Sequence, residues 1–141
     1  MNRQLREVFF IKDISLDSKD LALKCVNAAL ERKAEDLVIL KVKDVSSFAD
    51  YFVICSGNSD RQIQGLADHI GQKLKKAGIF PLGIEGERSG SWILMDYGDV
   101  IMHIFYKPVR EFYDIEGLWS DGPAMSIEES VQELTVLNDD M

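Results

Sequence analysis

Two periodicities of hydrophobic and polar residues predict helices and strands over most of this chain. Residues 18–33 repeat at the helical period, and residues 60–77 do so more strongly, with an apolar stripe about 100° wide. The stripe consists of Ile63, Leu66, Ala67, Ile70 and Leu74. Ser59 followed by Gln62 forms a capping-box pattern, which predicts that the second helix begins directly after Ser59. Two amphipathic helices are therefore expected.

The other apolar segments have the character of β-strands. Residues 36–44 are β-branched and partly alternating, whereas 51–57 are apolar on both faces, as expected of a central strand. A short strand is predicted over 81–86, a hairpin over 91–106, and a short helix or turns over 109–119. This order of elements predicts an α/β (α+β) domain with a mixed five-stranded sheet and two main helices.

The register of the hairpin follows from its turn. With Gly98 and Asp99 as a two-residue turn, one face of the hairpin is apolar with Tyr97 as its polar group, and this face should pack on the helices. The opposite face carries Trp92, Leu94, Asp96, Ile101, His103 and Phe105. Such a mixed face is either covered by the C-terminal segment or is a recognition surface, and the pattern alone favours neither.

The chain is expected to contain one domain with an extension at each end. We predict an N-terminal extension over 1–17, a single domain over 18–121 and an acidic tail over 122–141, in which Ser126 and Glu129 cap a weak helix. No apolar run approaches the roughly 20 residues that span a bilayer, and the first residues lack a secretory or transit pattern. A cytoplasmic protein away from membranes is expected.

Net charge restricts the class of partner. The formal net charge is −8, whereas affinity for nucleic acid comes from Lys and Arg that displace counterions from phosphates. Direct nucleic-acid binding is therefore disfavoured, and a basic protein partner is compatible with this charge.

A nucleotidyltransferase-like enzyme is the catalytic alternative. The stretch 56–59 is a Gly-Ser loop before a helix, where a phosphate could lie. The candidate carboxylates for two Mg²⁺ ions are Glu85, Glu87, Asp96 and Asp99. However, two of them flank a glycine at a strand end, another lies in the predicted turn, and Arg61 is the one basic residue near the loop. These residues favour catalysis only weakly.

Other chemistry has still less support. His69 and His103 lack further ligands at the spacing of a metal site. Cys25 and Cys55 lie in apolar surroundings typical of buried thiols, so a triad of Cys55, His103 and Asp96 would lack a reactive nucleophile. The sequence predicts no enzyme, no cofactor and no metal.

Long stretches of the chain resemble the ribosomal silencing factor family, also called Iojap. They are DVSSFADYFVICSGNSDRQIQGLADHI, GIEGERSGSWILMDYGDVIMHIFYKPVREFYDIEGLW and the following SD. The resemblance extends from about Leu21 to Asp121, and the two ends of the chain lie beyond it. It implies a fold similar to that of nucleotidyltransferases without their catalytic carboxylates, in which the corner at Ser59 would be a detail of the scaffold.

The resemblance also implies a function. Family members bind the large ribosomal subunit through its ribosomal protein fourteen, block association with the small subunit, repress translation when nutrients are scarce, and form homodimers when free. A large-subunit assembly role that uses the same surface is the alternative. The implied partner-binding residues are Trp92, Leu94, Asp96, His103, Phe105, Lys107, Arg110 and Tyr113. Trp92 would be the buried anchor, and Asp96, Lys107 and Arg110 would set register and association rate.

Overall fold

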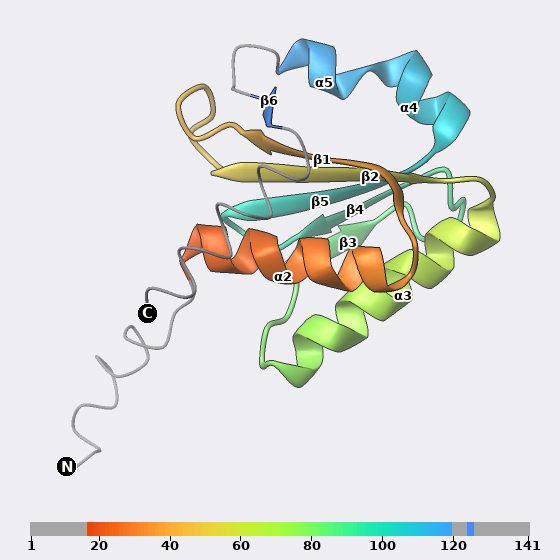
Figure 1. Cartoon of the computed structure of the whole chain (residues 1–141), viewed down its shortest axis with the longest axis horizontal. Coiled ribbons are helices and arrows are strands. Elements are labelled where there is room, and N and C mark those ends of the chain that lie inside the picture. The colour runs from red at the N-terminus through yellow and green to blue at the C-terminus, as the bar shows by residue number, and fades with distance from the viewer. Residues whose placement is uncertain (1–16, 120–123, 126–141) are drawn as a thin grey trace.

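A mixed β-sheet forms the centre of the domain (Figure 1). The computed structural model describes residues 17–119 and 124–125. In spatial order its strands are β3 (Gly83–Glu85), β4 (Trp92–Asp96), β5 (Val100–Tyr106), β2 (Tyr51–Gly57), β1 (Glu35–Lys41) and β6 (Ala124–Met125). β2 and β5 are parallel, and every other neighbouring pair is antiparallel. The five predicted strands and the mixed sheet are confirmed.

β6 adds two residues to the outer edge of β1, where they pair with Ile39 and Leu40. The sequence gives no sign of this strand, because a two-residue pairing leaves no periodic pattern. The predicted extension over 1–17, apart from Asp17, lies outside the described residues. So does the predicted weak helix that begins at Ser126.

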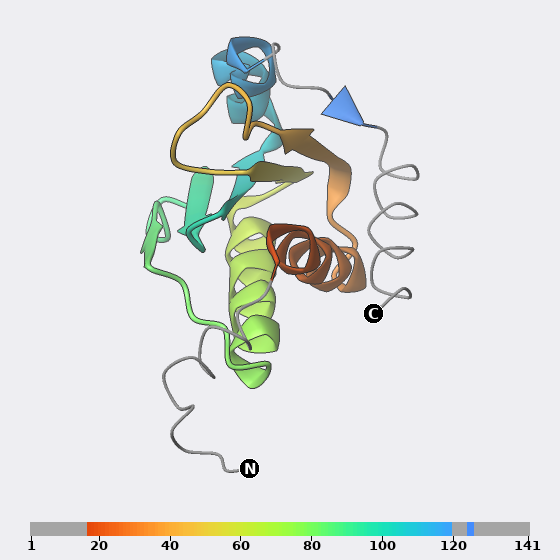
Figure 2. The ribbon, with the colours of Figure 1, turned by 90° about the vertical axis from the view of Figure 1, so that its left-hand side faces the viewer.

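Two helices cover one face of the sheet and two shorter helices lie on the other (Figure 2). The first pair is α2 (Ser18–Glu31) and α3 (Asp60–Lys76), as predicted. The second pair is α4 (Lys107–Tyr113) and α5 (Ile115–Leu118). Pro108 in the first turn of α4 suits its fixed φ. Asp114 (φ 44°) ends α4 and begins α5 in the left-handed conformation.

The start of α3 is secured by the predicted cap. Ser59 Oγ accepts a hydrogen bond from the Gln62 amide at 3.1 Å. The Gln62 side chain accepts from the Asn58 amide at 2.7 Å, one residue before the cap residue. The first bond satisfies a donor that the first helical turn leaves free, and the second holds the residue that precedes the cap.

The main core lies between the sheet and helices α2 and α3. All seven residues of β2 are buried, which confirms its predicted central place. In the hairpin, Ile93 pairs with Ile104 and Met95 with Met102, and all four side chains lie in this core. Gly98 has φ +87°, which only glycine adopts readily, so the predicted turn and register are confirmed.

The opposite face of the sheet carries a second, smaller core. Its buried members are Leu40, Val42, Ala49, Phe52, Ile54, Phe105 and Ile115. Trp92 and Trp119 are partly buried against it. Because Ile115 comes from α5, the C-terminal segment does cover part of the face that the sequence left undecided. The part that includes Trp92, Leu94 and Asp96 is only half-buried.

Candidate functional site

Aromatic rings form an unbroken series across this second face. Successive ring centroids lie 4.8–6.4 Å apart. In order, the members of this aromatic series are Phe112, Tyr113, Trp92, His103, Phe52, Trp119 and Phe48. Its two ends are open to solvent, since Phe112 is 78% exposed and Phe48 66% exposed, whereas His103 and Phe52 in the middle are each 4% exposed. The series therefore connects the interior of the second face with two exposed aromatic ends.

Trp92 lies where the sheet meets α4. Its ring stacks on Phe105 with centroids 4.8 Å apart and planes 27° apart, and Tyr113 flanks it at 5.1 Å. The indole Nε1 donates a hydrogen bond to Nδ1 of His103 at 3.1 Å. Trp92 is half-buried, so it presents apolar surface while three neighbours fix its position. Aromatic residues held in this way are typical anchors of protein interfaces.

The structure places the predicted partner-binding residues on β4, β5 and α4 at two depths. Half-buried or exposed are Trp92, Leu94, Asp96, Lys107 and Tyr113. Three others are buried, namely His103, Phe105 and Arg110. Little of their surface is exposed in the isolated chain, and their expected contact with a partner stays a prediction.

The carboxylate of Asp96 takes part in the hairpin turn. Its Oδ1 accepts a hydrogen bond from the Gly98 amide at 2.8 Å. This bond is a local side-chain contact of the kind that favours Asp before a turn. One carboxylate oxygen of Asp96 is therefore used within the turn, and the electrostatic role expected of Asp96 stays a prediction.

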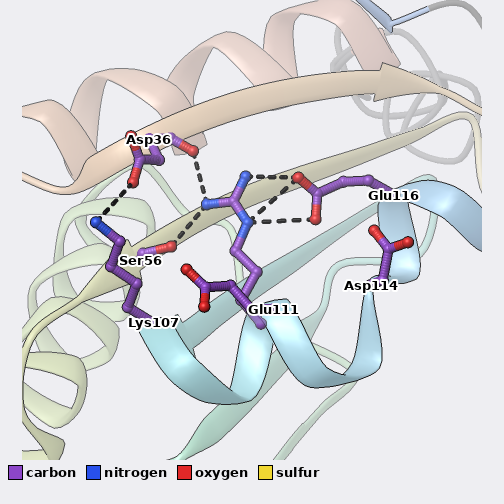
Figure 3. A pocket seen from close by; sticks show the side chains of 7 residues that line it. Asp36, Ser56, Lys107, Glu111, Asp114 and Glu116 are labelled. Carbon is purple, nitrogen blue, oxygen red and sulfur yellow. Dashed lines mark hydrogen bonds and ion pairs between the residues drawn. The ribbon is translucent and has the colours of Figure 1, made fainter.

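Arg110 joins three segments that are distant in sequence. Its Nη1 donates to the Asp36 carbonyl and to Ser56 Oγ, both at 2.7 Å, and its Nη2 donates to Glu116 Oε2 at 2.8 Å. Figure 3 shows Asp36, Ser56 and Glu116 around this network, with Lys107 beside Asp36. The guanidinium thus fixes α4 and α5 against β1 and β2.

A cavity of about 280 Å³ opens beside the Arg110 network. It is lined by Asp36, Ser56, Lys107, Arg110, Glu111, Asp114 and Glu116. Four of these are carboxylates, and the two cations pair with Asp36 and Glu116. The lining therefore offers a phosphate group no unpaired cation.

Sequence reasoning missed three exposed apolar residues near this surface. Phe112, Leu118 and Phe48 are all strongly exposed. Phe112 lies on α4, and Leu118 lies on α5 together with the buried Ile115. A helical period through Ile115 would place both of them, three residues before and three after it, on its own buried face. Periodicity therefore could not have revealed their exposure, and the break between the two helices at Asp114 is visible only in the structure. Phe48 stands alone in a Ser-containing loop, which is itself a signal of exposure.

The corner at Ser59 borders a cavity of about 420 Å³. Its lining consists of Asn58, Ser59, Asp60, Ser89, Gly90, Ser91 and Tyr106. This lining contributes a carboxylate and no Lys or Arg, an arrangement that disfavours a polyphosphate. Within residues 17–119 and 124–125, no cluster of three or more His, Cys, Asp or Glu residues could hold a metal ion.

The two cysteines are buried thiols, as predicted. Burial raises the pKa of Cys25 and of Cys55 to about 12, which keeps both protonated and unreactive at neutral pH. Cys55 lies in the main core and pairs across the sheet with Ile104. His103 lies on the opposite face, against Phe52 and Trp92, so Cys55 and His103 cannot act together.

His103 makes the stability of the fold sensitive to acid. Burial lowers the pKa of His103 to about 4, whereas an unfolded histidine titrates near 6.5. Below about pH 6.5 the unfolded chain binds a proton that the folded chain does not bind, so stability falls as pH decreases towards 4. We expect the free energy of unfolding to fall by roughly 2–3 kcal/mol between pH 7.5 and 4.5 from this group.

Urea unfolding at several pH values measures this effect. His103→Asn removes the titrating ring and keeps a hydrogen-bond acceptor on the side chain. Subtracting the pH dependence of the variant's stability from that of the natural protein removes the contribution of the carboxylates that both proteins contain. Equal acid sensitivity of the variant and the natural protein would contradict the assignment to His103.

The helices of the described ranges have at most 17 residues. None of them combines the length and the apolar character needed to cross a membrane.

Known proteins are similar to this chain in sequence and in fold. The family model "Ribosomal silencing factor during starvation" matches residues 15–140, so the match extends past Asp121 into most of the acidic tail. The ribosomal silencing factor RsfS of Halalkalibacterium halodurans is 38% identical over 113 residues, which cover 80% of this chain and 97% of that protein. The mouse protein named "Mitochondrial assembly of ribosomal large subunit protein 1" is 30% identical over 98 residues, or 67% of this chain and 43% of that protein.

A crystal structure of a Chromobacterium violaceum protein superposes with a TM-score of 0.73 at 34% identity, covering 74% of this chain and 88% of that one. Sequence and fold thus agree over most of the domain, and the aromatic series lies inside the matched region. The chain belongs to the ribosomal silencing factor family.

Proposed function

We propose that this chain is a cytoplasmic ribosomal silencing factor. It binds the large ribosomal subunit through ribosomal protein fourteen, blocks association with the small subunit and so represses translation under nutrient limitation. The match of the family model over residues 15–140 carries this proposal. A regulator that acts by occupying a surface needs a docking face and no catalytic centre.

The second face of the sheet has the chemistry of such a docking face. Exposed aromatic residues next to a half-buried tryptophan are typical of interface centres, where a few large side chains supply most of the affinity. Glu111, Asp114 and Glu116 border it on α4 and α5. Together with the net charge of −8, these acids suit a basic ribosomal protein better than RNA.

Trp92→Ala is expected to weaken binding to isolated large subunits at least about tenfold, because it removes the anchor of the face. Co-sedimentation of the purified protein with large subunits measures the loss. Phe80→Ala is the matched control, since Phe80 is an exposed aromatic residue outside the aromatic series. Equal binding by the two variants, with both shown to be folded by urea unfolding, would remove Trp92 from the docking face.

A role in assembly of the large subunit is the second candidate, and the name of the mouse relative favours it. Subunit joining separates the two functions. Mature subunits mixed with this protein should form fewer complete ribosomes if it silences, and as many as before if it acts only in assembly. We propose further that the free protein is a homodimer, which sedimentation equilibrium tests directly.

A further inference from the structure

A hydrogen bond between two ring side chains determines how the tryptophan of the proposed docking face is presented. The Trp92 indole N–H points at Nδ1 of His103, with 3.1 Å between the nitrogens. An indole nitrogen can only donate a hydrogen bond. Nδ1 of His103 must therefore carry no proton, and the neutral ring holds its proton on Nε2.

His103 is well suited to keep this state. It is 4% exposed, and its ring is nearly parallel to that of Phe105, with planes 9° apart. The edge of Phe52 lies against it at a centroid distance of 4.8 Å. Its Nε2 has no hydrogen-bond partner among the described residues. Apolar surroundings of this kind strongly disfavour the charged ring, which would lack an acceptor on Nδ1.

We infer that His103 is a positioning residue: by accepting the indole N–H, it holds Trp92 in the one orientation that the docking face presents. This inference rests on the proposed function for its biological meaning, but the hydrogen bond itself can be tested without a ribosome. Stacking on Phe105 and contact with Tyr113 limit tilting of the indole. The hydrogen bond to His103 then fixes which edge of the indole faces the interior.

The orientation also defines the chemistry of the partner. Since the indole N–H already donates to His103, the ring offers a partner its carbon atoms and no free donor. A partner therefore meets Trp92 with an apolar side chain or an aliphatic stem, and not with a hydrogen-bond acceptor. The fixed ring lowers the conformational entropy lost on docking.

Three variants test the inference. His103→Leu removes the acceptor and keeps an apolar side chain of similar bulk, whereas His103→Asn keeps an acceptor near the position of Nδ1. The chain has two tryptophans, so Trp119→Phe assigns the indole resonances of an ¹⁵N-labelled protein. In the natural protein the Trp92 indole proton should exchange with solvent slowly. In His103→Leu we expect exchange at least about tenfold faster, and in His103→Asn a return towards the natural rate.

Docking is the second readout. His103→Leu should bind large subunits about tenfold more weakly, and His103→Asn should recover most of this loss. An unchanged exchange rate in His103→Leu would overturn the positioning role whatever the ribosome result. Faster exchange with unchanged docking, in a protein whose Trp92→Ala variant does lose docking, would overturn the link to the partner alone. Unchanged docking of Trp92→Ala itself would instead count against the proposed docking face.

Discussion

Replacing Arg110 with methionine is expected to lower the free energy of unfolding by about 3 kcal/mol. The guanidinium is nearly buried and donates to Asp36, Ser56 and Glu116. Methionine fills much of the same space. It leaves the Ser56 hydroxyl and the Asp36 carbonyl without a donor, and the Glu116 carboxylate without its cation. Such a loss destabilises the fold by more than the intact ion pair stabilises it, because each group left without its partner is still buried away from water. Urea unfolding measures the change.

Lys107→Met is the matched control for Arg110→Met. Lys107 also pairs with Asp36, but over 3.9 Å and with both side chains about half-exposed or more. Exposed pairs contribute little, so this variant should change stability by no more than about 0.5 kcal/mol. A second test combines Arg110→Met with Glu116→Leu, which removes both charges and should recover part of the loss. Equal effects of Arg110→Met and Lys107→Met would show that the network does not hold α4 and α5.

Gly86→Ala is expected to cost more than about 3 kcal/mol and to displace the start of β4. Gly86 has φ +85°, and a Cβ atom there would lie 2.0 Å from the carbonyl oxygen of Trp92. That oxygen belongs to the backbone, so relief requires movement of the strand that carries Trp92. The docking face should therefore be lost together with stability, as measured by urea unfolding and by co-sedimentation with large subunits.

Gly78→Ala separates the cost of the positive φ at Gly86 from the cost of the contact with the Trp92 carbonyl oxygen. Gly78 has a similar φ of +80°, but a Cβ there meets no atom within 4 Å. Gly78→Ala should lower the free energy of unfolding by about 1 kcal/mol, because alanine is strained in the left-handed conformation. If Gly86→Ala costs no more than Gly78→Ala, the contact with the Trp92 carbonyl is tolerated and the prediction fails.

The parts of the fold that could be predicted are those with local causes. A two-residue turn at Gly98 fixes the whole hairpin register, and the Ser59 cap fixes the start of α3. Arg110 shows the opposite case, since its acceptors Asp36 and Ser56 stand 74 and 54 residues away. A family motif identifies such a residue as significant, but only the tertiary fold reveals whether its charge faces a partner or the interior.

The second face of the sheet was predictable only in composition. The register placed Trp92, His103 and Phe105 together, which the structure confirms. How far α5 covers them depends on the turn at Asp114, a non-glycine residue in the left-handed conformation, and on one buried contact of Ile115. No period or motif encodes the angle between α4 and α5, so only the structure shows that His103 and Phe105 are buried while Trp92 stays half-buried.

The parallel pairing of β2 with β5 has a consequence for biosynthesis. Tyr51 is opposite Val100. During synthesis, β2 therefore cannot pair with β5 until about half of the domain has followed it out of the ribosome. Until then a segment whose seven residues are all buried in the finished fold has only the β1 neighbour to shield it. We expect the nascent chain to require chaperone protection during this interval, and truncations that end before residue 100 to aggregate instead of folding.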